Sequence, residues 1–508
     1  MTSDQALLRW LAASGVELHY SLYLEQDPST GLSFYTAEPL ARDTTVIRVP
    51  KGLCITSVTA RERIEALLAA FGISDSGLEA SSLPAPDWIL LYIATCRLAT
   101  EYLSTASEPS EVLAAALPHL PYVDHIPKII ETPLHFSPAE LTLLSATPLV
   151  GSTERRLRET IVDYERARSL LEDPLQQALH QPFAAFLATK LGSIPKDQLD
   201  ADALMAKTYH KGLELWRWAE SAFTSRSFPA RLVGLSDGLS EASSGASPLA
   251  KSAPILIPAY DTFNHARAHP VTWTFSSASQ VDSRDMVCMT INYAVDSAPA
   301  QVYNNYGGKS NEELLAGYGF TLDTITEDTL ALKIGSDDPN AEAKTHYWAV
   351  PSASTKSEND DSTSTSTSRS ELFTRALCPC PSLLAEIETR VLRGEAAPTS
   401  DEDRLDLYGS VLETLEALLL SKRKAFRASQ KQIEALQSTF PLQTANCESP
   451  GWHRSSAAAD PSQPSSLRPS VWHNAMQYRA GQLHLLNHAV EWTRTELARV
   501  ADALDDLE

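Results

Sequence analysis

Residues 301–320 read QVYNNYGGKSNEELLAGYGF and carry the strongest fold signal in the chain. The letters GGKS at 307–310 match the end of a phosphate-binding P-loop, but Tyr303 stands where that loop requires a glycine. We therefore exclude a nucleotide-binding P-loop. A second segment, AYDTFNH at 259–265, follows the apolar run ILIP at 255–258, which predicts a buried strand.

Together, the two segments resemble the signature segments of SET-domain methyltransferases. In that family, an Asn-His pair lies beside the methyl donor S-adenosylmethionine (AdoMet). A tyrosine shortly before a KSN-x-ELL run and a Tyr-Gly-Phe stands over the methyl-transfer channel. The resemblance implies that Asn264 and His265 bind AdoMet and that Tyr306 is catalytic. It also implies a C-terminal segment threaded through an earlier loop, which would bring Asn264 and Tyr306 together.

The same resemblance supplies the other expected site residues. Near the N-terminus, the family has a Gly-x-Gly segment that passes the AdoMet, and here it reads Gly31-Leu32-Ser33, so the second glycine is lost. Gly31 and Ser33 are nevertheless the expected cofactor-binding residues of this segment. Phe320 is expected either to face the cofactor or to fill the core. The residues expected near the substrate are Arg226, Asp261 and Tyr318.

The rest of the chain predicts an α+β fold. Short β-leaning runs at 34–36 and 46–49 predict a small twisted sheet. Apolar residues at helical spacing continue to about residue 228. A long helical insertion at this place separates the Rubisco large-subunit methyltransferase-like subgroup from compact histone-type SET domains. Residues 405–440 keep a heptad-like spacing that predicts a helix on the order of 54 Å long, and a last helix is expected from about 471 to 504.

We therefore predict a SET-fold β core with a long helical insertion and a helical C-terminal substrate-binding lobe. The predicted segments are the N-terminal part of the SET core at 1–60, the helical insertion at 61–228, the C-terminal part of the core with the AdoMet site at 229–335, and the C-terminal lobe at 336–508, with low-complexity linkers at 352–370 and 444–469. Residues 235–252 are rich in Ser, Gly and Ala and predict a surface loop.

The composition of the chain limits the cellular compartments in which we expect the protein. The chain has 508 residues, of which 43% are hydrophobic, enough for more than one core. No apolar window of about 18 residues exists to span a bilayer, and the first thirty or so residues lack a signal-peptide layout. We therefore expect a cytoplasmic and/or nuclear protein without membrane association. Six scattered cysteines fit a reducing compartment.

The net charge of −22 disfavours direct binding to nucleic acid, because phosphate contacts need clustered Lys and Arg. A basic protein partner would fit this charge, although net acidity alone also keeps a large protein in solution. The expected oligomeric state is a monomer.

The sequence predicts no metal site. His265 and His269 lie four residues apart, but Ala266 replaces the glutamate of a His-Glu-x-x-His zinc motif. Cys378 and Cys380 resemble the start of the zinc-binding cluster that follows some histone-type SET domains, but further cysteines are missing at the required spacing. No G-x-G-x-x-G follows a predicted strand, which disfavours a Rossmann-type enzyme.

The resemblance implies an AdoMet-dependent protein-lysine N-methyltransferase that acts on a non-histone protein, such as a ribosomal protein or an elongation factor. Transfer requires a neutral amine about 3 to 3.5 Å from the methyl carbon, in line with the breaking bond. Desolvation beside the cationic sulfonium lowers the pKa of the lysine and favours that neutral form.

Two alternatives stay open. One is a protein-histidine methyltransferase on the same fold, and the other is a non-catalytic SET-fold protein-binding module, which the altered Gly31-Leu32-Ser33 favours. A helical-repeat adaptor is disfavoured, because the chain has no fixed period of about 20 to 50 residues. The sequence leaves the substrate and the degree of methylation undetermined.

Overall fold

The structure is a computed structural model of the chain. It describes residues 3–28, 30–73, 78, 83–105, 110–194, 210–234, 254–267, 269–278, 284–335, 344–349, 381–439 and 467–507. Of these, the residues within 1–130 and 156–306 form a first compact unit, and those within 131–155, 307–446 and 459–508 form a second. The predicted loop at 235–252, the linker at 352–370, most of the linker at 444–469, and Cys378 and Cys380 lie outside the described residues. The predicted division into four segments stays a prediction.

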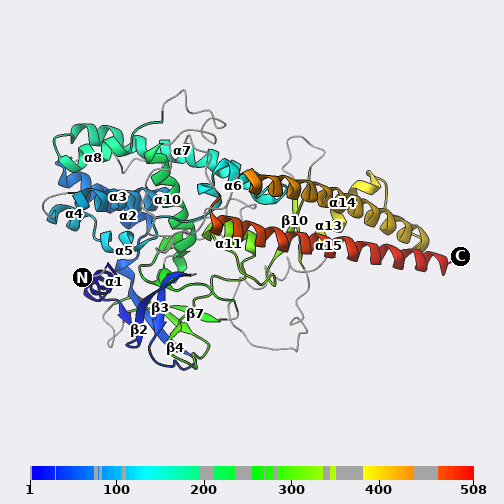
Figure 1. The fold of residues 1–508 in the computed structure, drawn as a ribbon, viewed down its shortest axis with the longest axis horizontal. Coiled ribbons are helices and arrows are strands. Elements are labelled where there is room, and N and C mark those ends of the chain that lie inside the picture. Colours follow the sequence, from blue (N-terminus) through cyan, green and yellow to red (C-terminus); the bar gives the residue numbers. More distant parts are fainter. Residues whose placement is uncertain are drawn as a thin grey trace. The chain divides into compact units, whose positions relative to one another are not determined.

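Small antiparallel sheets form the β part of the first unit (Figure 1). One has the order β1 (Glu17–Leu18), β4 (Thr44–Pro50), β8 (Met286–Ile291) and β7 (Val271–Ser276); a second joins β2 (Leu22–Asp27), β3 (Gly31–Thr36) and β9 (Ala300–Gln301); a third pairs β5 (Ser227–Pro229) with β6 (Pro254–Leu256). The predicted strands at 34–36 and 46–49 are confirmed as β3 and β4. Their β-branched and aromatic residues lie in the core, where the rings of Phe34 and Phe263 pack 4.7 Å apart.

The predicted helical insertion forms most of the remaining first unit. Its helices are α2 (Ser57–Ala70), α3 (Ala85–Thr105), α4 (Glu111–Ala116), α5 (Leu120–His125), α7 (Pro148–Gln177, whose first residues belong to the second unit), α8 (Pro182–Lys190) and α10 (Lys211–Arg226), and α1 (Ser3–Ala13) precedes the sheets. Short 3-10 turns lie at η1 (Lys51–Leu53), η5 (Ala230–Val233) and η7 (Tyr260–Thr262). A capping box between Thr56 and Thr59 starts α2, and the stripe of Ile64, Leu67 and Leu68 packs this helix onto α3.

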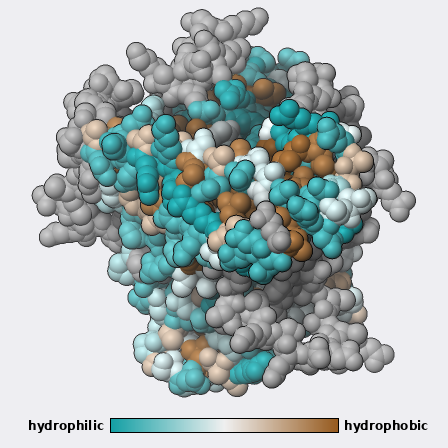
Figure 2. Space-filling view, turned by 90° about the vertical axis from the view of Figure 1, so that its right-hand side faces the viewer, coloured by the Kyte–Doolittle hydropathy of each residue, from teal (hydrophilic) through white to brown (hydrophobic). Residues whose placement is uncertain are grey.

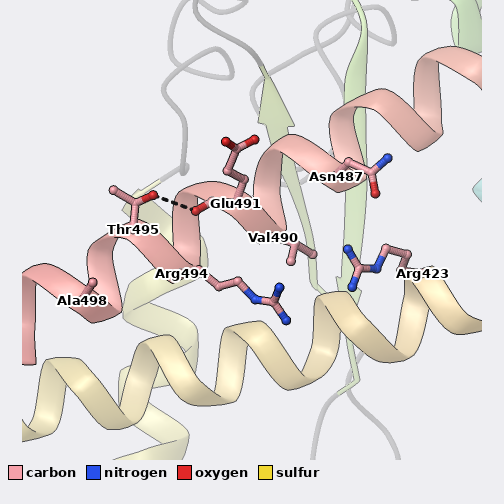
Figure 3. A pocket seen from close by; sticks show the side chains of 7 residues that line it. All are labelled: Arg423, Asn487, Val490, Glu491, Arg494, Thr495 and Ala498. Atoms are coloured by element: carbon pink, nitrogen blue, oxygen red, sulfur yellow. Dashed lines mark hydrogen bonds between the residues drawn. The ribbon is translucent and has the colours of Figure 1, made fainter.

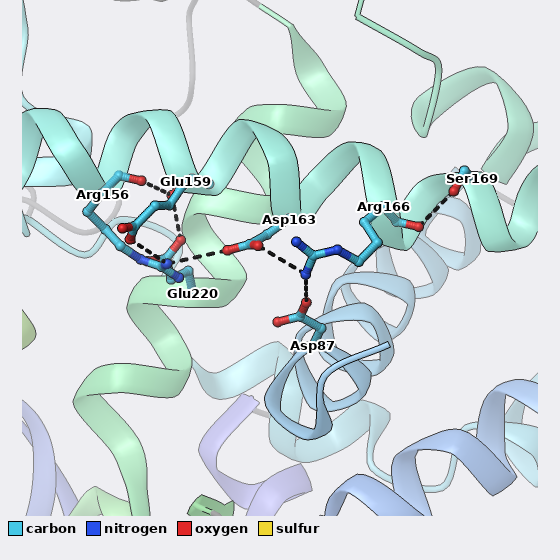
Figure 4. Close-up of polar contacts among 8 residues, drawn as sticks. Asp87, Arg156, Glu159, Asp163, Arg166, Ser169 and Glu220 are labelled. Atoms are coloured by element: carbon cyan, nitrogen blue, oxygen red, sulfur yellow. Dashed lines mark hydrogen bonds and ion pairs between the residues drawn. The ribbon is translucent and has the colours of Figure 1, made fainter. Parts of the chain in front are cut away.

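A cluster of ion pairs joins α3, α7 and α10 (Figure 4). Arg156 contacts Glu220 and lies 3.3 Å from Asp163. Arg166 lies 3.3 Å from Asp87 and 3.2 Å from Asp163. Burial and the neighbouring Asp163 carboxylate raise the pKa of Asp87 to about 6, although Arg166 opposes this shift. The cluster therefore contains more carboxylates than its two arginines can neutralise.

Replacing Asp87 by Asn should remove a pH dependence of stability. The pKa of Asp87 in the folded state lies above its ordinary value of 3.8, so the folded state binds this proton more tightly. The free energy of unfolding should therefore fall between about pH 4 and pH 6.5 in the wild type, by on the order of 1–3 kcal/mol. Chemical denaturation across this range should show a flatter profile for Asp87→Asn, with stability at pH 7 at least equal to that of the wild type. The exposed Asp43→Asn is the control, and an Asp87→Asn profile parallel to that of the wild type would contradict the assignment.

The second unit is built on two long helices that lie along each other (Figure 1). Its elements are η3 (Pro133–His135), α6 (Pro138–Thr142), α11 (Asn311–Tyr318), β10 (Thr329–Ile334), β11 (Lys344–Ala349), α13 (Pro381–Leu392), α14 (Asp401–Thr439) and α15 (Pro469–Asp505). The two long helices predicted from the sequence are α14 and α15. Leu415 and Leu419 of α14 share a core with Leu485 and Leu486 of α15. None of the described helices is long and apolar enough to cross a membrane.

The antiparallel hairpin of β10 and β11 was not predicted: β10 falls at the end of the segment predicted as SET core, β11 falls in the segment predicted as a helical lobe, and neither was predicted as a strand. Its sequence signal is present, since Leu330, Leu332 and Ile334 alternate with other residues and all face the core. Trp348 of β11 is fully buried in the same core. The hairpin therefore adds strands to a lobe that is otherwise helical.

A half-buried arginine and a fully buried one, Arg468 and Arg479, stabilise the second unit. Arg468, just before α15, lies 2.8 Å from the Glu140 carboxylate of α6, and the arginine outweighs the effect of burial and lowers the pKa of Glu140. Arg479 lies within α15, is 2% exposed and packs 4.2 Å from the centre of the Phe426 ring. It donates to the carbonyls of Leu143 and Ser145, and burial lowers its pKa to about 10.

The end of α11 requires a glycine. Gly319 has a φ of +81°, and a Cβ there would lie 2.7 Å from the carbonyl carbon of Glu131. We predict that Gly319→Ala lowers the free energy of unfolding by about 1–3 kcal/mol, because strain adds to a backbone clash. Gly317→Ala, inside the same helix with open space beside it, is the matched control and should be neutral or stabilising. Equal unfolding midpoints for the two variants would refute this account.

Candidate active site

A short parallel backbone pairing brings two distant segments of the first unit together. His265 and Asn304 form a parallel bridge. The Asn304 N–H donates to the Asn264 carbonyl at 2.8 Å, and the Ala266 N–H donates to the Asn304 carbonyl at 3.1 Å. The Val302 N–H bonds to the carbonyl of Phe34 in β3. Segments 264–266 and 302–306 and strand β3 therefore meet at one place.

Tyr306 is held at this meeting point by three contacts. Its backbone N–H donates to Nδ1 of His265 at 3.1 Å, so Nδ1 acts as an acceptor. Its ring stacks on the His265 ring, with centres 5.0 Å apart and planes 18° apart. Its hydroxyl donates to the Phe263 carbonyl at 3.0 Å. The predicted catalytic tyrosine thus lies directly beside the predicted Asn-His pair.

The N-terminal glycine segment reaches the same place. The Asn264 side-chain amide donates to the Thr30 carbonyl at 3.1 Å, and its backbone N–H lies 3.4 Å from Oγ of Ser33. Gly31 has a φ of +82°, and no described atom lies within 4 Å of a Cβ built there. The structure thus gathers Gly31, Ser33, Asn264 and His265, four of the five predicted cofactor-binding residues.

Next to this cluster, the buried carboxylate of Asp261 contacts two side chains, those of Arg226 and Tyr122; we call these three residues the triad. Nη1 of Arg226, at the end of α10, lies 2.9 Å from Oδ2 of Asp261, and the Tyr122 hydroxyl of α5 donates to the same oxygen at 2.9 Å. The Asp261 side chain is 1% exposed. Burial favours the neutral guanidine, but the Asp261 carboxylate outweighs it and raises the pKa of Arg226. Burial and the same carboxylate raise the pKa of Tyr122 well above its usual value.

The second carboxylate oxygen of this triad, Oδ1 of Asp261, is buried and has no hydrogen-bond partner among the described residues. Tyr306 is close enough to Arg226 to contribute to its raised pKa. A buried carboxylate oxygen without a donor is unusual and costly, so this acceptor stands out among the described polar groups of the site.

Aromatic side chains stabilise the pairing of His265 with Asn304. The indole N–H of Trp273 donates to Oδ1 of the fully buried Asn304 at 3.1 Å. Tyr293 bonds to both the carbonyl and the N–H of Tyr303, and burial raises the pKa of Tyr293 to about 12. His269 packs against both tyrosine rings. These contacts are structural and fix the course of residues 302–306.

Two predicted site residues are not placed here. Tyr318 and Phe320 belong to the second unit, where their rings lie 6.1 Å apart, and their roles toward substrate and cofactor stay predictions. Among the described residues, no group of three or more His, Cys, Asp and Glu side chains could hold a metal ion.

Sequence reasoning missed Tyr122, Asn304 and the carbonyl of Thr30. Tyr122 lies in the predicted helical insertion, where the sequence was interpreted only through its apolar spacing. Its contact with Asp261 spans 139 residues of the sequence, and only the fold reveals such a contact. Asn304 lies two residues before Tyr306, in a segment whose polar residues gave no sign of burial.

The chain was compared with protein-family models, with curated proteins and with solved structures. No protein-family model matches the chain. Solved structures of Rubisco LSMT share its fold: the SET domain bound to lysine and AdoHcy (17% identity, TM-score 0.52) and the AdoMet-bound form (18%, 0.52) each align with 98% of this chain, and with 92% and 93% of theirs. The chain thus has the SET-domain fold of the Rubisco large-subunit methyltransferase type, as its sequence predicted, and the α+β class is confirmed.

Curated relatives carry more specific names. The chain is 26% identical over 213 residues to the Schizosaccharomyces pombe "Ribosomal lysine N-methyltransferase set10". It is 23% identical over 339 residues to the Saccharomyces cerevisiae "Ribosomal lysine N-methyltransferase 1", and 23% identical over 319 residues to "Protein-lysine N-methyltransferase EFM1" of the same yeast. These alignments cover 42%, 66% and 62% of this chain, but only 30%, 52% and 48% of the relatives. The chain therefore spans about half or less of the length of these relatives.

Removing one partner of the buried triad should be costly. We predict that Arg226→Met lowers the free energy of unfolding by about 3–5 kcal/mol, because it leaves the Asp261 carboxylate buried without its cation. The double variant Arg226→Met with Asp261→Leu should recover much of this loss. Urea denaturation of the wild type, both single variants and the double variant measures the coupling. Additive effects would show that the two side chains do not act as a pair.

Proposed function

We propose that the chain is an AdoMet-dependent protein-lysine N-methyltransferase. One observation carries the proposal: residues 31–33, 263–266 and 302–306 converge in a SET fold and set Tyr306 beside Asn264 and His265. These segments are far apart in the sequence, and each matches a family segment to which the resemblance assigns a part in methyl transfer.

The residues at the convergence fit AdoMet. Gly31 has the positive φ that lets backbone approach a ligand, and the space beside it is open among the described residues. Asn264 hydrogen-bonds to Thr30 and Ser33, and so fixes residues 30–33 and residues 263–266, which we call the two walls of the site, relative to each other. AdoMet would supply an electrophilic methyl group on a sulfonium. Backbone groups of Gly31 to Ser33, with Asn264 and His265, would hold it.

The remaining residues of the site would position the amine. The Tyr306 hydroxyl donates a hydrogen bond to the Phe263 carbonyl, and because a hydroxyl oxygen can also accept, it could take an N–H of a substrate amine. Arg226 and Tyr122 keep the Asp261 carboxylate in place, and the ion pair with Arg226 offsets its negative charge, so that it favours the protonated lysine less. Burial would lower the pKa of the lysine and favour the neutral, nucleophilic form.

The proposed substrate is a non-histone protein, with a ribosomal protein first and an elongation factor second. The names of two curated relatives support the first choice. The net charge of −22 supports a basic substrate, as ribosomal proteins commonly are, and opposes direct nucleic-acid binding. We further propose that the protein acts as a monomer in the cytoplasm and/or nucleus.

The binding-module alternative drew its support from the altered Gly31-Leu32-Ser33. In the structure, Oγ of Ser33 lies 3.4 Å from the Asn264 N–H, so the serine contributes to the cluster in place of the usual glycine. This contact favours the enzyme over the scaffold.

AdoMet binding measured by calorimetry tests the proposal. The wild type should bind. Asn264→Ala should weaken binding by about tenfold or more, because it disconnects two walls of the site, whereas Tyr306→Phe should largely preserve binding. Asn292→Ala is the control for an asparagine outside the site, since its amide bonds Asp43 at the surface. No heat of binding at millimolar AdoMet would remove the enzyme proposal and leave the binding module.

A further inference from the structure

We infer that the groove between α14 and α15 binds an extended acidic segment of a partner protein. The groove lies wholly within the second unit and its role does not depend on the methyltransferase proposal. A cavity of about 590 Å³ opens between the two helices, and a second of about 520 Å³, whose described lining belongs to α14 alone, continues from it along α14; Arg423 lines both. The first is lined by Arg423, Asn487, Val490, Glu491, Arg494, Thr495 and Ala498, and the second by Leu420, Arg423, Lys424, Arg427, Ala428 and Lys431.

Positive charge gathers in this groove, against the charge of the whole chain. Among the described residues that line the two cavities, five are cationic and Glu491 is the sole acidic one. Figure 3 shows Arg423 and Arg494 reaching toward the space between the helices, while the Glu491 carboxylate points away from α14. In a chain of net charge −22, such a local concentration of cations is a distinct feature.

Four of these five cations have no carboxylate partner among the described residues. Arg494 has an ion pair with Glu416. Arg423, Lys424, Arg427 and Lys431 make no ion pair with any of the described residues. By contrast, other arginines of the second unit, such as Arg468 and Arg404, do have carboxylate partners. Like charges that converge on one groove repel each other, and an anionic ligand would relieve that repulsion.

The spacing of these cations suits an extended peptide. Arg423, Arg427 and Lys431 are four residues apart on one helix face, so they repeat every 6 Å or so along α14. Alternate side chains of an extended strand repeat every 6.5 to 7 Å or so. Carboxylates at every second position of such a segment would therefore meet successive cations, and Arg423 and Arg494 could share one carboxylate.

The apolar lining favours a peptide over a nucleic acid. Leu420 and Ala428 lie among the cations of one cavity, and Val490 and Ala498 among those of the other. On the face drawn in Figure 2, hydrophobic residues lie between hydrophilic ones on the described surface. A peptide can offer apolar side chains between its carboxylates, whereas a nucleic acid needs a larger basic footprint than one stripe in an acidic protein.

Fluorescence anisotropy on the full chain tests the inference. The probe is a labelled peptide of about ten residues in which Glu alternates with Val, and the control peptide has Lys in place of each Glu. At low salt, the Glu peptide should bind saturably and the Lys peptide should not. Binding should weaken as salt rises, because solvent-exposed charges are screened.

The double variant Arg423→Gln with Arg427→Gln should weaken binding of the Glu peptide by about tenfold or more. The matched control is Arg404→Gln, on the same helix and outside both cavities. A helical spectrum equal to that of the wild type shows that the double variant still folds.

Three results would overturn the inference. They are no saturable binding of the Glu peptide, equal binding by the double variant, and tighter binding of a single-stranded RNA of similar charge that the double variant loses. The last result would assign the groove to nucleic acid instead.

Discussion

Four backbone atoms decide where the chemistry of this protein can occur. The parallel pairing of His265 with Asn304 forces residues 302–306 to run alongside residues 264–266. Parallel neighbours need a long connection, and here the connecting chain includes strands β7, β8 and β9. Tyr306 follows this pairing by two residues, so the stack on His265 and the bond to the Phe263 carbonyl are consequences of it. The hydrogen bonds from Trp273 to Asn304 and between Tyr293 and Tyr303 hold this pairing in register.

Charge burial then ties the helical insertion to the β core of the first unit. Asp261 lies in the turn after β6, and its carboxylate is held by Arg226 from α10 and Tyr122 from α5. A buried carboxylate is expensive unless it is paired, so the two helices cannot shift without a large cost. The insertion therefore does more than fill space, because it sets the orientation of an acid beside the proposed reaction centre.

Local sequence patterns predicted the parts of the fold that local forces determine. Periodic apolar residues gave the helices of the insertion and the long α14, and the segment 259–265 with Tyr306 gave the centre of the site. The β10 and β11 hairpin was missed, although Leu330, Leu332 and Ile334 alternate, because its strands straddle the predicted boundary between the SET core and the helical lobe. Tyr122 could not be found, since its partner Asp261 is remote in sequence and no local pattern encodes a contact of that range.

Methyl transfer to protein is the most direct test of the central claim, that Tyr306 is placed to serve a lysine amine. Purified wild type and Tyr306→Phe, matched in AdoMet binding, are incubated with methyl-labelled AdoMet and a ribosomal protein fraction, and the labelled amino acid is then identified after hydrolysis. The account predicts label in methyl-lysine for the wild type and a loss of about a hundredfold or more for Tyr306→Phe. Label in methyl-histidine, or equal rates for the two proteins, would contradict it.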